Sequence, residues 1–400
     1  MKQFFLRVLK FLLTFLIGMA LSLCVGILIG AASSGKSVAE AFQQVFSSHS
    51  AITFALIGWF ILWMAVSAVL QIILHEAGHL LMGLLTGYRF VSFRIFQFTL
   101  IRHDGHYRWK RFSLAGTGGQ CLMSPPDKPI EQVDTRWYNA GGVLANLLTA
   151  ALAIATLDLC ALPQWLEVLL LSMAIMGIIY GLLNGIPLKI SGIPNDGHNL
   201  FHLEKSPQAK FLLCRMLMAN ALIQEGTQPK DMPSPWFEPT QTGSWTDSMW
   251  ANWQMMATAR LLNLHRWEEA HALLADAMSQ RDHLLKLFRL ELSAEYVFVC
   301  LVTGRTHEAQ NAYDPETEKY VRLYAATQSS KQRILMAVSL LLRNDAEHAA
   351  HILHDTQARR DQYLLQGEAD MDIHLMEWLL HQPIPTQTIS NSSEHEENPL

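Results

Sequence analysis

The sequence predicts a polytopic α-helical membrane protein of about four spans, with a small membrane-associated β-hairpin and an all-α cytoplasmic helical-repeat domain. Three observations support this prediction. Long apolar runs fill the first half of the chain, positive charges cluster between particular runs, and a weak internal repeat follows in a helix-forming second half. Half of the 400 residues are hydrophobic, because the composition of the whole chain combines a strongly apolar first part with a second part of ordinary composition.

The four apolar runs cover residues 11–32, 51–85, 140–162 and 165–183. Each is about long enough to cross a hydrocarbon core roughly 30 Å thick. The first run also fits a secretory signal peptide, because basic residues precede it and small residues follow it. A retained span is favoured because the apolar stretch is longer than a usual signal core. Residues 1–50 are therefore predicted to form a transmembrane helix and an external loop.

Lysine and arginine residues orient these spans. Three precede the first run, one lies between the first and second, and the segment between the second and third carries Arg89, Arg94, Arg102, Arg108, Lys110, Arg111, Lys128 and Arg136. The positive-inside rule then places the N-terminus, the 86–137 segment and everything after about residue 190 in the cytoplasm. We expect a multi-pass protein of the cell membrane. The net charge of −5 lacks the excess of positive charge that is typical of nucleic-acid-binding proteins, so we exclude that class of function.

The second run contains the motif "HEAGH". Its His75, Glu76 and His79 are the only ionisable groups of "VLQIILHEAGHLLMGLL". Because residues four apart share a helix face, both imidazoles can offer a ring nitrogen to one Zn²⁺ ion. Glu76 is placed to take a proton from a water that the metal activates, rather than to bind the metal. A chance match is disfavoured, because a carboxylate inside a membrane costs on the order of 3 kcal/mol.

A catalytic zinc needs a third protein ligand, and Asp196 is the best candidate. It lies in "LLNGIPLKISGIPNDGHNL", after a run that passes from outside to inside, so it emerges at the level of His79. The helix breakers around it are typical of irregular backbone that lines a cavity in the membrane. An exposed turn at "PNDG" is the alternative. His198 and His202, four residues apart, are the fallback ligands.

Together "HEAGH", the later "N..P…DG" and the intervening "YNAGGVLANLL" resemble the site-2 protease family of intramembrane zinc metalloproteases over about residues 50–200. The resemblance implies that His75, His79 and Asp196 bind zinc within a core at residues 51–205. It also implies that Glu76 is the catalytic base. Asn146 would direct its amide into the site to position the substrate or an oxyanion. The alternative for Asn146 is an ordinary interhelical hydrogen bond.

Two features depart from the family pattern. Gly141 and Gly142 stand where the family more often has Gly-Pro, and the distance from Asn184 to Asp196 is longer than the compact family spacing. Both bear on substrate positioning more than on zinc binding.

The segment 88–123 is predicted to form the β-hairpin. In "FRIFQFTLIRHDGHYRWKRFSL" apolar and polar residues alternate imperfectly on both sides of an Asp104-Gly105 turn. Related proteases place a small sheet near the active site, and its edge can hold an extended substrate. The alternative is a basic hairpin on the membrane surface, anchored by Tyr107 and Trp109. His103 and His106 lie in the turn and are not counted as ligands.

The second half is predicted to be a linker, a helical-repeat domain and a tail. Prolines and small polar residues between Glu225 and Trp250 mark a linker, assigned to 206–248, or a loop that covers the next domain. Residues 383–400 have little to bury and are expected to be disordered. Within 249–382, three segments place a leucine eight residues before an alanine, at Leu262 and Ala270, Leu301 and Ala309, and Leu341 and Ala349. This period is similar to tetratricopeptide repeats and predicts a docking surface for a cytoplasmic protein partner. The alternative is a non-repetitive bundle.

The sequence therefore predicts a zinc-dependent intramembrane endopeptidase. Its substrate would be a membrane-embedded peptide or protein, cut at a transmembrane or membrane-proximal bond near the cytoplasmic face. Two alternatives come from other classes. One is a non-proteolytic membrane scaffold with a structural zinc, and the other is a peptide-transport or immunity factor with a protease-like core.

Overall fold

The computed structural model describes residues 50–382, apart from Asp104, 113–117, Ser191 and 239–241, together with residues 35, 37–40 and 43. The predicted first span at 11–32 and the tail at 383–400 lie outside the described residues.

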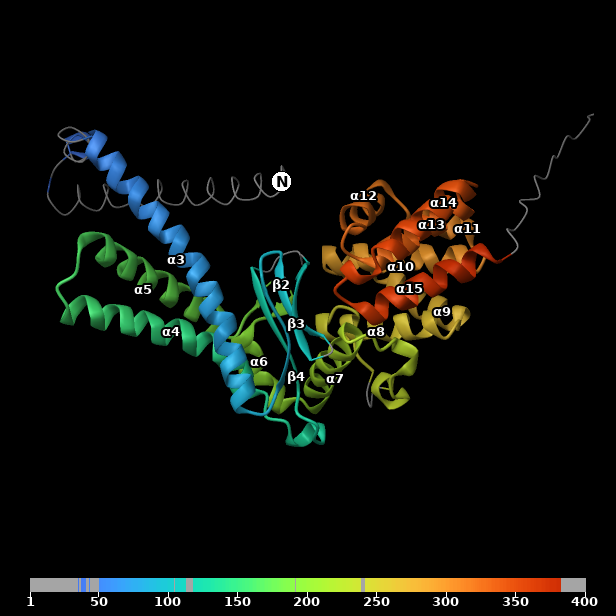
Figure 1. The fold of residues 1–400 in the computed structure, drawn as a ribbon, viewed down its shortest axis with the longest axis horizontal. Coiled ribbons are helices and arrows are strands. Elements are labelled where there is room, and N and C mark those ends of the chain that lie inside the picture. The colour runs from blue at the N-terminus through green and yellow to red at the C-terminus, as the bar shows by residue number, and fades with distance from the viewer. Residues whose placement is uncertain are drawn as a thin grey trace, which may run out of the picture.

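Three helices of the described chain are long and apolar enough to cross a membrane. The candidate spans are Gly58–Leu85, Ile130–Leu159 and Gln164–Gly185. The first lies in α3 (Ser50–Leu85), the second covers η1 (Ile130–Gln132) and α4 (Arg136–Leu159), and the third is α5 (Gln164–Gly185). The three correspond to the second, third and fourth apolar runs of the sequence. Figure 1 shows them converging towards a small sheet, with the C-terminal helices on its other side.

Glycines allow α3 and α4 to approach each other closely. A Cβ atom added to Gly78 of α3 would lie 2.2 Å from the carbonyl oxygen of Gly141 of α4, and one added to Gly141 would lie 2.4 Å from that of Gly78. On α5, a Cβ at Gly177 would meet the backbone oxygen of Asn146 at 2.8 Å. Small residues at such crossings are the usual way in which membrane helices pack, because dispersion contacts replace the hydrophobic effect there.

The sheet is antiparallel and has the order β3-β2-β1-β4. Its strands are β1 (Arg89–Ile95), β2 (Phe98–His103), β3 (His106–Arg111) and β4 (Gly119–Ser124). The predicted hairpin corresponds to β2 and β3, in which His103 pairs with His106 around the turn. The structure adds β1 and β4, so the sheet is larger than the sequence predicts.

Strand β4 has two different faces. Cys121 and Met123 are buried against Tyr88 and Val133, on the side of the candidate membrane helices. Gln120 and Leu122 alternate with them and line a cavity on the opposite side. The sheet therefore separates the three candidate membrane helices from the C-terminal helices.

The segment expected to be a linker begins with α7 (Pro207–Gln224). Ser206 caps this helix by accepting a hydrogen bond from the backbone nitrogen of Ala209, and Pro207 occupies its first turn. Leu212 and Cys214 are buried, and α7 contacts both β4 and α8. The first part of this segment therefore packs between the sheet and the C-terminal helices.

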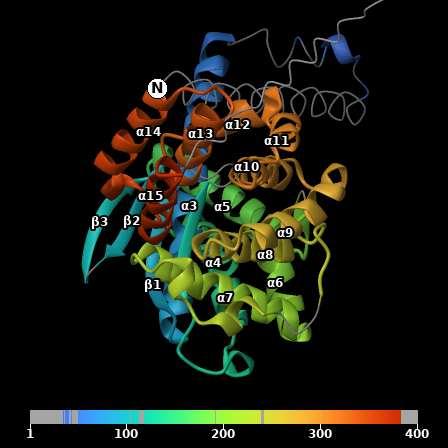
Figure 2. The same ribbon diagram turned by 90° about the vertical axis from the view of Figure 1, so that its right-hand side faces the viewer.

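The helices from α8 onwards form one apolar core. They are α8 (Ser248–Asn263), α9 (Trp267–Ser279), α10 (Lys286–Val302), α11 (Thr306–Ala312), α12 (Pro315–Tyr324), α13 (Ser329–Leu341), α14 (Ala346–Ala358) and α15 (Gln366–Leu380). Figure 2 views them from their own side, in front of the sheet and α4.

Three of the helix pairs have equivalent turns. The pairs are α8–α9, α10–α11 and α13–α14, and the second helix of each carries Ala270, Ala309 or Ala349, all fully buried. Five residues before each alanine, the turn contains a residue with positive φ, namely His265 at 56°, Gly304 at 74° and Asn344 at 52°. Helix α12 is inserted between the second and third pairs. The leucine and alanine spacing of the sequence thus coincides with a repeated hairpin geometry.

Candidate metal centre

Three side chains from distant parts of the chain meet at the junction of α3, α4 and α6 (Asp196–His202). Oδ2 of Asp196 lies 3.0 Å from Nε2 of His75 and 3.4 Å from Nε2 of His79. The two Nε2 atoms are 3.1 Å apart. The structure therefore brings together the three residues that the sequence singled out as ligands, and their ligand atoms are close enough to hold one metal ion.

Hydrogen bonds on the far side of each imidazole direct the Nε2 atoms to this point. Nδ1 of His75 lies 2.7 Å from Oδ1 of Asn146, and Nδ1 of His79 lies 2.7 Å from the carbonyl oxygen of Tyr138. Because these oxygens only accept, each Nδ1 carries the proton and each Nε2 presents a lone pair. Two lone pairs and a carboxylate oxygen then face one another, an arrangement that a bound cation stabilises.

The hydrogen bonds continue through Gln71, which lies one helical turn before His75. Nδ2 of Asn146 donates to the backbone oxygen of Gln71 at 2.9 Å and to its Oε1 at 2.7 Å. Nε2 of Gln71 donates to the carbonyl oxygen of Met173 on α5 at 3.0 Å. A buried amide in an apolar run is the sequence signal that points to Gln71.

This network bears on the role expected for Asn146. The side chain is fully buried, its oxygen faces His75, and both hydrogen bonds of its Nδ2 go to Gln71. The geometry matches the interhelical alternative and adds an orienting contact to His75. A contact with substrate or an oxyanion stays a prediction, because it requires Nδ2 to leave Gln71.

Gly142 provides the space for the two imidazoles. A Cβ atom on Gly142 would lie 2.5 Å from Cε1 of His75 and 2.6 Å from the Nε2 atoms of His75 and His79. Real Cβ atoms do not approach other atoms this closely, so a side chain here would displace the rings. The second glycine of "AGG" is therefore required by the site itself.

Glu76 is buried beside the histidines and lies outside the group of three ligands. Its carboxylate packs against β4, since a Cβ atom on Gly119 would lie 2.5 Å from Oε1 of Glu76. The edge strand of the sheet and the acidic residue of "HEAGH" are thus in direct contact.

Asn195 holds Asp196 at the start of α6. Its Oδ1 accepts from the backbone nitrogen of His198 at 2.9 Å, and its Nδ2 donates to the carbonyl oxygen of Leu183 at the end of α5 at 2.7 Å. His198 and His202 stack on each other, with ring centroids 4.2 Å apart. In the described structure these fallback ligands do not join the group around Asp196.

A second group with metal-binding residue types lies among the C-terminal helices, at His271, Cys300 and Glu308. Hydrogen bonds account for it, because Tyr296 donates to Glu308 and Nε2 of His271 lies 3.2 Å from the same carboxylate. Burial is the main cause that raises the pKa of the Cys300 thiol to about 12. We therefore take the group around Asp196 as the candidate centre.

Two imidazoles and one carboxylate are a ligand set found at catalytic zinc sites, where a further position stays open. The chain matches no protein-family model, no curated protein and no solved structure.

Proposed function

We propose that the protein is a zinc-dependent intramembrane endopeptidase that hydrolyses transmembrane or membrane-proximal peptide bonds near the cytoplasmic face. The observation that carries the proposal is the convergence of His75, His79 and Asp196 beside Glu76, next to a candidate membrane span. The resemblance of residues 50–200 to the site-2 protease family supports the same reading.

The residues divide the chemistry between them. Zinc in this site would supply the Lewis acidity that makes water a nucleophile near neutral pH. Glu76 accepts the proton of the attacking water and passes it to the leaving amine. Asn146 and the carbonyl oxygen of Tyr138 keep the imidazoles in the tautomer that binds a cation.

Strand β4 is suited to present the substrate. A peptide bond within a helix is hidden, so the helix must unwind before water can attack. β4 is an edge strand and contacts Glu76 through Gly119. A substrate that adds to this edge as an extended strand regains the backbone hydrogen bonds that unwinding removes. Tyr107 and Trp109 are exposed on β3, the opposite edge, which is the one available for contact with a membrane surface.

The finer architecture belongs to the same proposal. The run at 11–32 would add a fourth span, and the positive charges of the 86–137 segment would place the sheet and the C-terminal helices in the cytoplasm. The three helical hairpins would act as a tetratricopeptide-like docking domain for a protein partner.

The test compares the wild type with Glu76→Gln. We expect the variant to keep one zinc per chain and to lose turnover, because the ligands are intact and the proton acceptor is gone. Membrane proteins and peptides would be quantified in cells that carry the wild type, Glu76→Gln or no copy. The same short transmembrane species should accumulate in the variant and in the deletion.

Glu167→Gln is the matched control, because Glu167 is an exposed acid in the first turn of α5. It should behave as the wild type. Full cleavage by Glu76→Gln would overturn the proposal. A deletion phenotype that Glu76→Gln does not reproduce would favour a non-proteolytic scaffold instead.

A further inference from the structure

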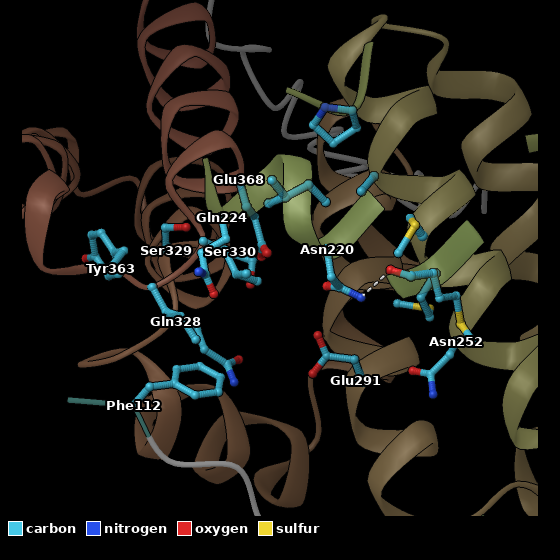
Figure 3. Close-up of a pocket in the computed structure, with 18 of the residues that line it drawn as sticks. Phe112, Asn220, Gln224, Asn252, Glu291, Gln328, Ser329, Ser330, Tyr363 and Glu368 are labelled. Atoms are coloured by element: carbon cyan, nitrogen blue, oxygen red, sulfur yellow. Dashed lines mark hydrogen bonds between the residues drawn. The ribbon is translucent and has the colours of Figure 1, made fainter. Parts of the chain in front are cut away.

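A cavity of about 530 Å³ lies between the sheet, α7, α8 and the C-terminal helices. Ser92, Gln120 and Leu122 form its wall on the sheet. The same strand β4 that provides Gln120 and Leu122 contacts Glu76 on its other face, through Gly119. Strand β4 therefore lies between the cavity and the candidate metal centre. Figure 3 shows Asn220, Gln224, Glu291 and Glu368 around this space.

The ionisable groups at this cavity carry an excess of negative charge. The lining includes Glu291 and Glu295 of α10, Arg333 of α13 and Glu368 of α15, while Lys331 of α13 and Asp372 of α15 are buried and lie outside the lining. Lys331 pairs with Glu291 at 2.5 Å, and Arg333 pairs with Glu295 and with Asp372, both at 2.7 Å. Three carboxyl groups and one guanidinium thus line the cavity. Among the described residues, no Lys or Arg forms an ion pair with Glu368.

A second observation concerns Gln224 of α7, which also lines the cavity. The residue is 0% exposed, and its Nε2 donates to the backbone oxygen of Val91 at 2.9 Å. Its Oε1 has no hydrogen-bond partner in the described structure, and neither do Nη1 of Arg333 and the hydroxyl of Tyr363, which also line the cavity. Buried acceptors without a partner are rare in folded proteins, because each costs about 1–3 kcal/mol. A hydrogen-bond donor is the group that this position lacks.

The apolar part of the lining suits a long side chain. Phe112, Phe288, Tyr320 and Tyr324 line the cavity. Aromatic rings accommodate the aliphatic stem of a lysine or arginine and attract its charged end. A donor, a positive charge and a long apolar stem are thus the properties of the missing group.

We propose that this cavity binds the side chain of a lysine or arginine in the cytoplasmic flank of the substrate. The identity of the partner rests on the proposed function. Transmembrane segments generally carry an excess of Lys and Arg on their cytoplasmic side. A substrate held along β4 would present that flank next to the cavity, so the basic residue would set the position of the chain relative to the metal centre.

The protonation of Glu368 gives the site a pH dependence. Burial is the largest cause that raises the pKa of Glu368 to about 8, and the neighbouring Asp372 adds to it. Of the other charges that face Glu368, Lys331 opposes this shift while Glu295 and Glu291 favour it. A bound cation favours the ionised form, so binding releases a proton and should strengthen as the pH rises from 6 to 9.

The experiment measures binding to the full chain carrying Glu76→Gln, so that no cleavage is required. The probes are fluorescein-labelled extended peptides that differ at one position, which is lysine, norleucine or glutamate. By fluorescence anisotropy we expect the lysine peptide to bind roughly ten-fold or more tightly than the norleucine peptide. Adding Glu368→Gln should remove this preference and its pH dependence.

Glu377→Gln is the matched control, because Glu377 lies on the same helix α15 and hydrogen-bonds to Gln357 outside the cavity. It should keep the preference for lysine. Equal binding of the lysine and norleucine peptides, with unaltered protein, would overturn the proposal. An unchanged preference for lysine in Glu368→Gln would also overturn it. If spermidine displaces all three peptides and they bind equally, the cavity is a site for free cations and the proposal falls.

The two proposals fail in different ways. If the wild type cleaves nothing but the lysine preference depends on Glu368, the cavity assignment stands and the protease assignment falls. If the wild type cleaves its substrates and the peptides bind equally, the reverse holds. Circular dichroism of each variant checks that the helices remain folded.

Discussion

Gly142 shows how a single missing Cβ atom shapes the candidate centre. The residue faces both imidazoles, and no side chain fits between α4 and the ligands. The sequence pattern identifies the histidines as a pair on one helix face. The need for glycine at this position is visible only once α4 is packed against α3.

Gly142→Ala should therefore weaken the proposed zinc site. The added methyl group would overpack the ligands at a cost of about 1–3 kcal/mol, which corresponds to a loss of zinc affinity of roughly five-fold to 150-fold. Competition with a zinc-chelating dye measures the affinity. Gly58→Ala is the control, since a Cβ atom at Gly58 of α3 meets nothing within 4 Å. An unchanged affinity in Gly142→Ala would contradict the packing argument.

Asn146→Ala separates two roles at the same position. If Asn146 orients His75, its loss should lower zinc affinity by about ten-fold to a hundred-fold. If it contacts the substrate or an oxyanion, zinc affinity should stay constant and kcat should fall. We expect the first outcome, because Oδ1 of Asn146 already contacts Nδ1 of His75. Thr156→Ala is the control, because Thr156 is partly exposed on the same helix and its hydroxyl donates to the backbone oxygen of Leu152 in that helix.

At the scale of elements, the three helical hairpins depend on their turns. His265, Gly304 and Asn344 occupy equivalent positions with positive φ. Left-handed backbone is unfavourable for residues with a Cβ atom, although asparagine tolerates it better than most. The turn conformation therefore limits which residues each hairpin accepts, independently of the core around it.

Gly304→Ala should destabilise the second hairpin by about 1 kcal/mol, which is a fall in Tm of roughly 2–4 °C. The cost is conformational, because a Cβ atom at Gly304 meets nothing within 4 Å. Gly304→Asn should lose less, since asparagine occupies the equivalent turn at Asn344. Thermal unfolding of the full chain followed by circular dichroism compares the two. Equal losses would show that the left-handed turn is not the cause.

Helix α7 illustrates what composition alone misses. The 206–248 segment is predicted to be a linker from the prolines and small polar residues of 225–250. It begins with a helix, in which Pro207 occupies the first turn, where a missing backbone N–H costs nothing. The same residue type breaks a helix in its interior and begins one at its first position. Burial of Leu212 and Cys214 then fixes α7 beside the sheet.

For the whole molecule, the proposed orientation can be tested at one natural cysteine. Cys160 follows α4 and is exposed, whereas Cys121, Cys214 and Cys300 are buried. The candidate centre lies towards the other ends of α3, α4 and α5, so the proposed topology places Cys160 outside the cell. In a Cys24→Ser background, a membrane-impermeant maleimide should label intact cells, and Cys160→Ser should abolish the labelling. Labelling that requires cell lysis would reverse the orientation.

Several features follow from local sequence. The apolar runs are recognisable because their length and composition are set by the bilayer, and three of them coincide with candidate membrane helices. "HEAGH" places two imidazoles on one face because helix periodicity is a short-range property. The leucine and alanine spacing also corresponds to the fold, since the leucine and the alanine of each pair belong to the same helical hairpin.

Other features were decided only by the tertiary structure. The contact of Asn146 with His75, the packing of β4 against Glu76, and the meeting of α10, α13 and α15 around Glu368 all join segments that are distant in the sequence. No local pattern specifies them, because hydrogen-bond partners, close approaches and unpaired charges depend on which surfaces come together. The sequence by itself determined the types and spacing of the ligands, whereas the packing of helices and sheet decided what surrounds them.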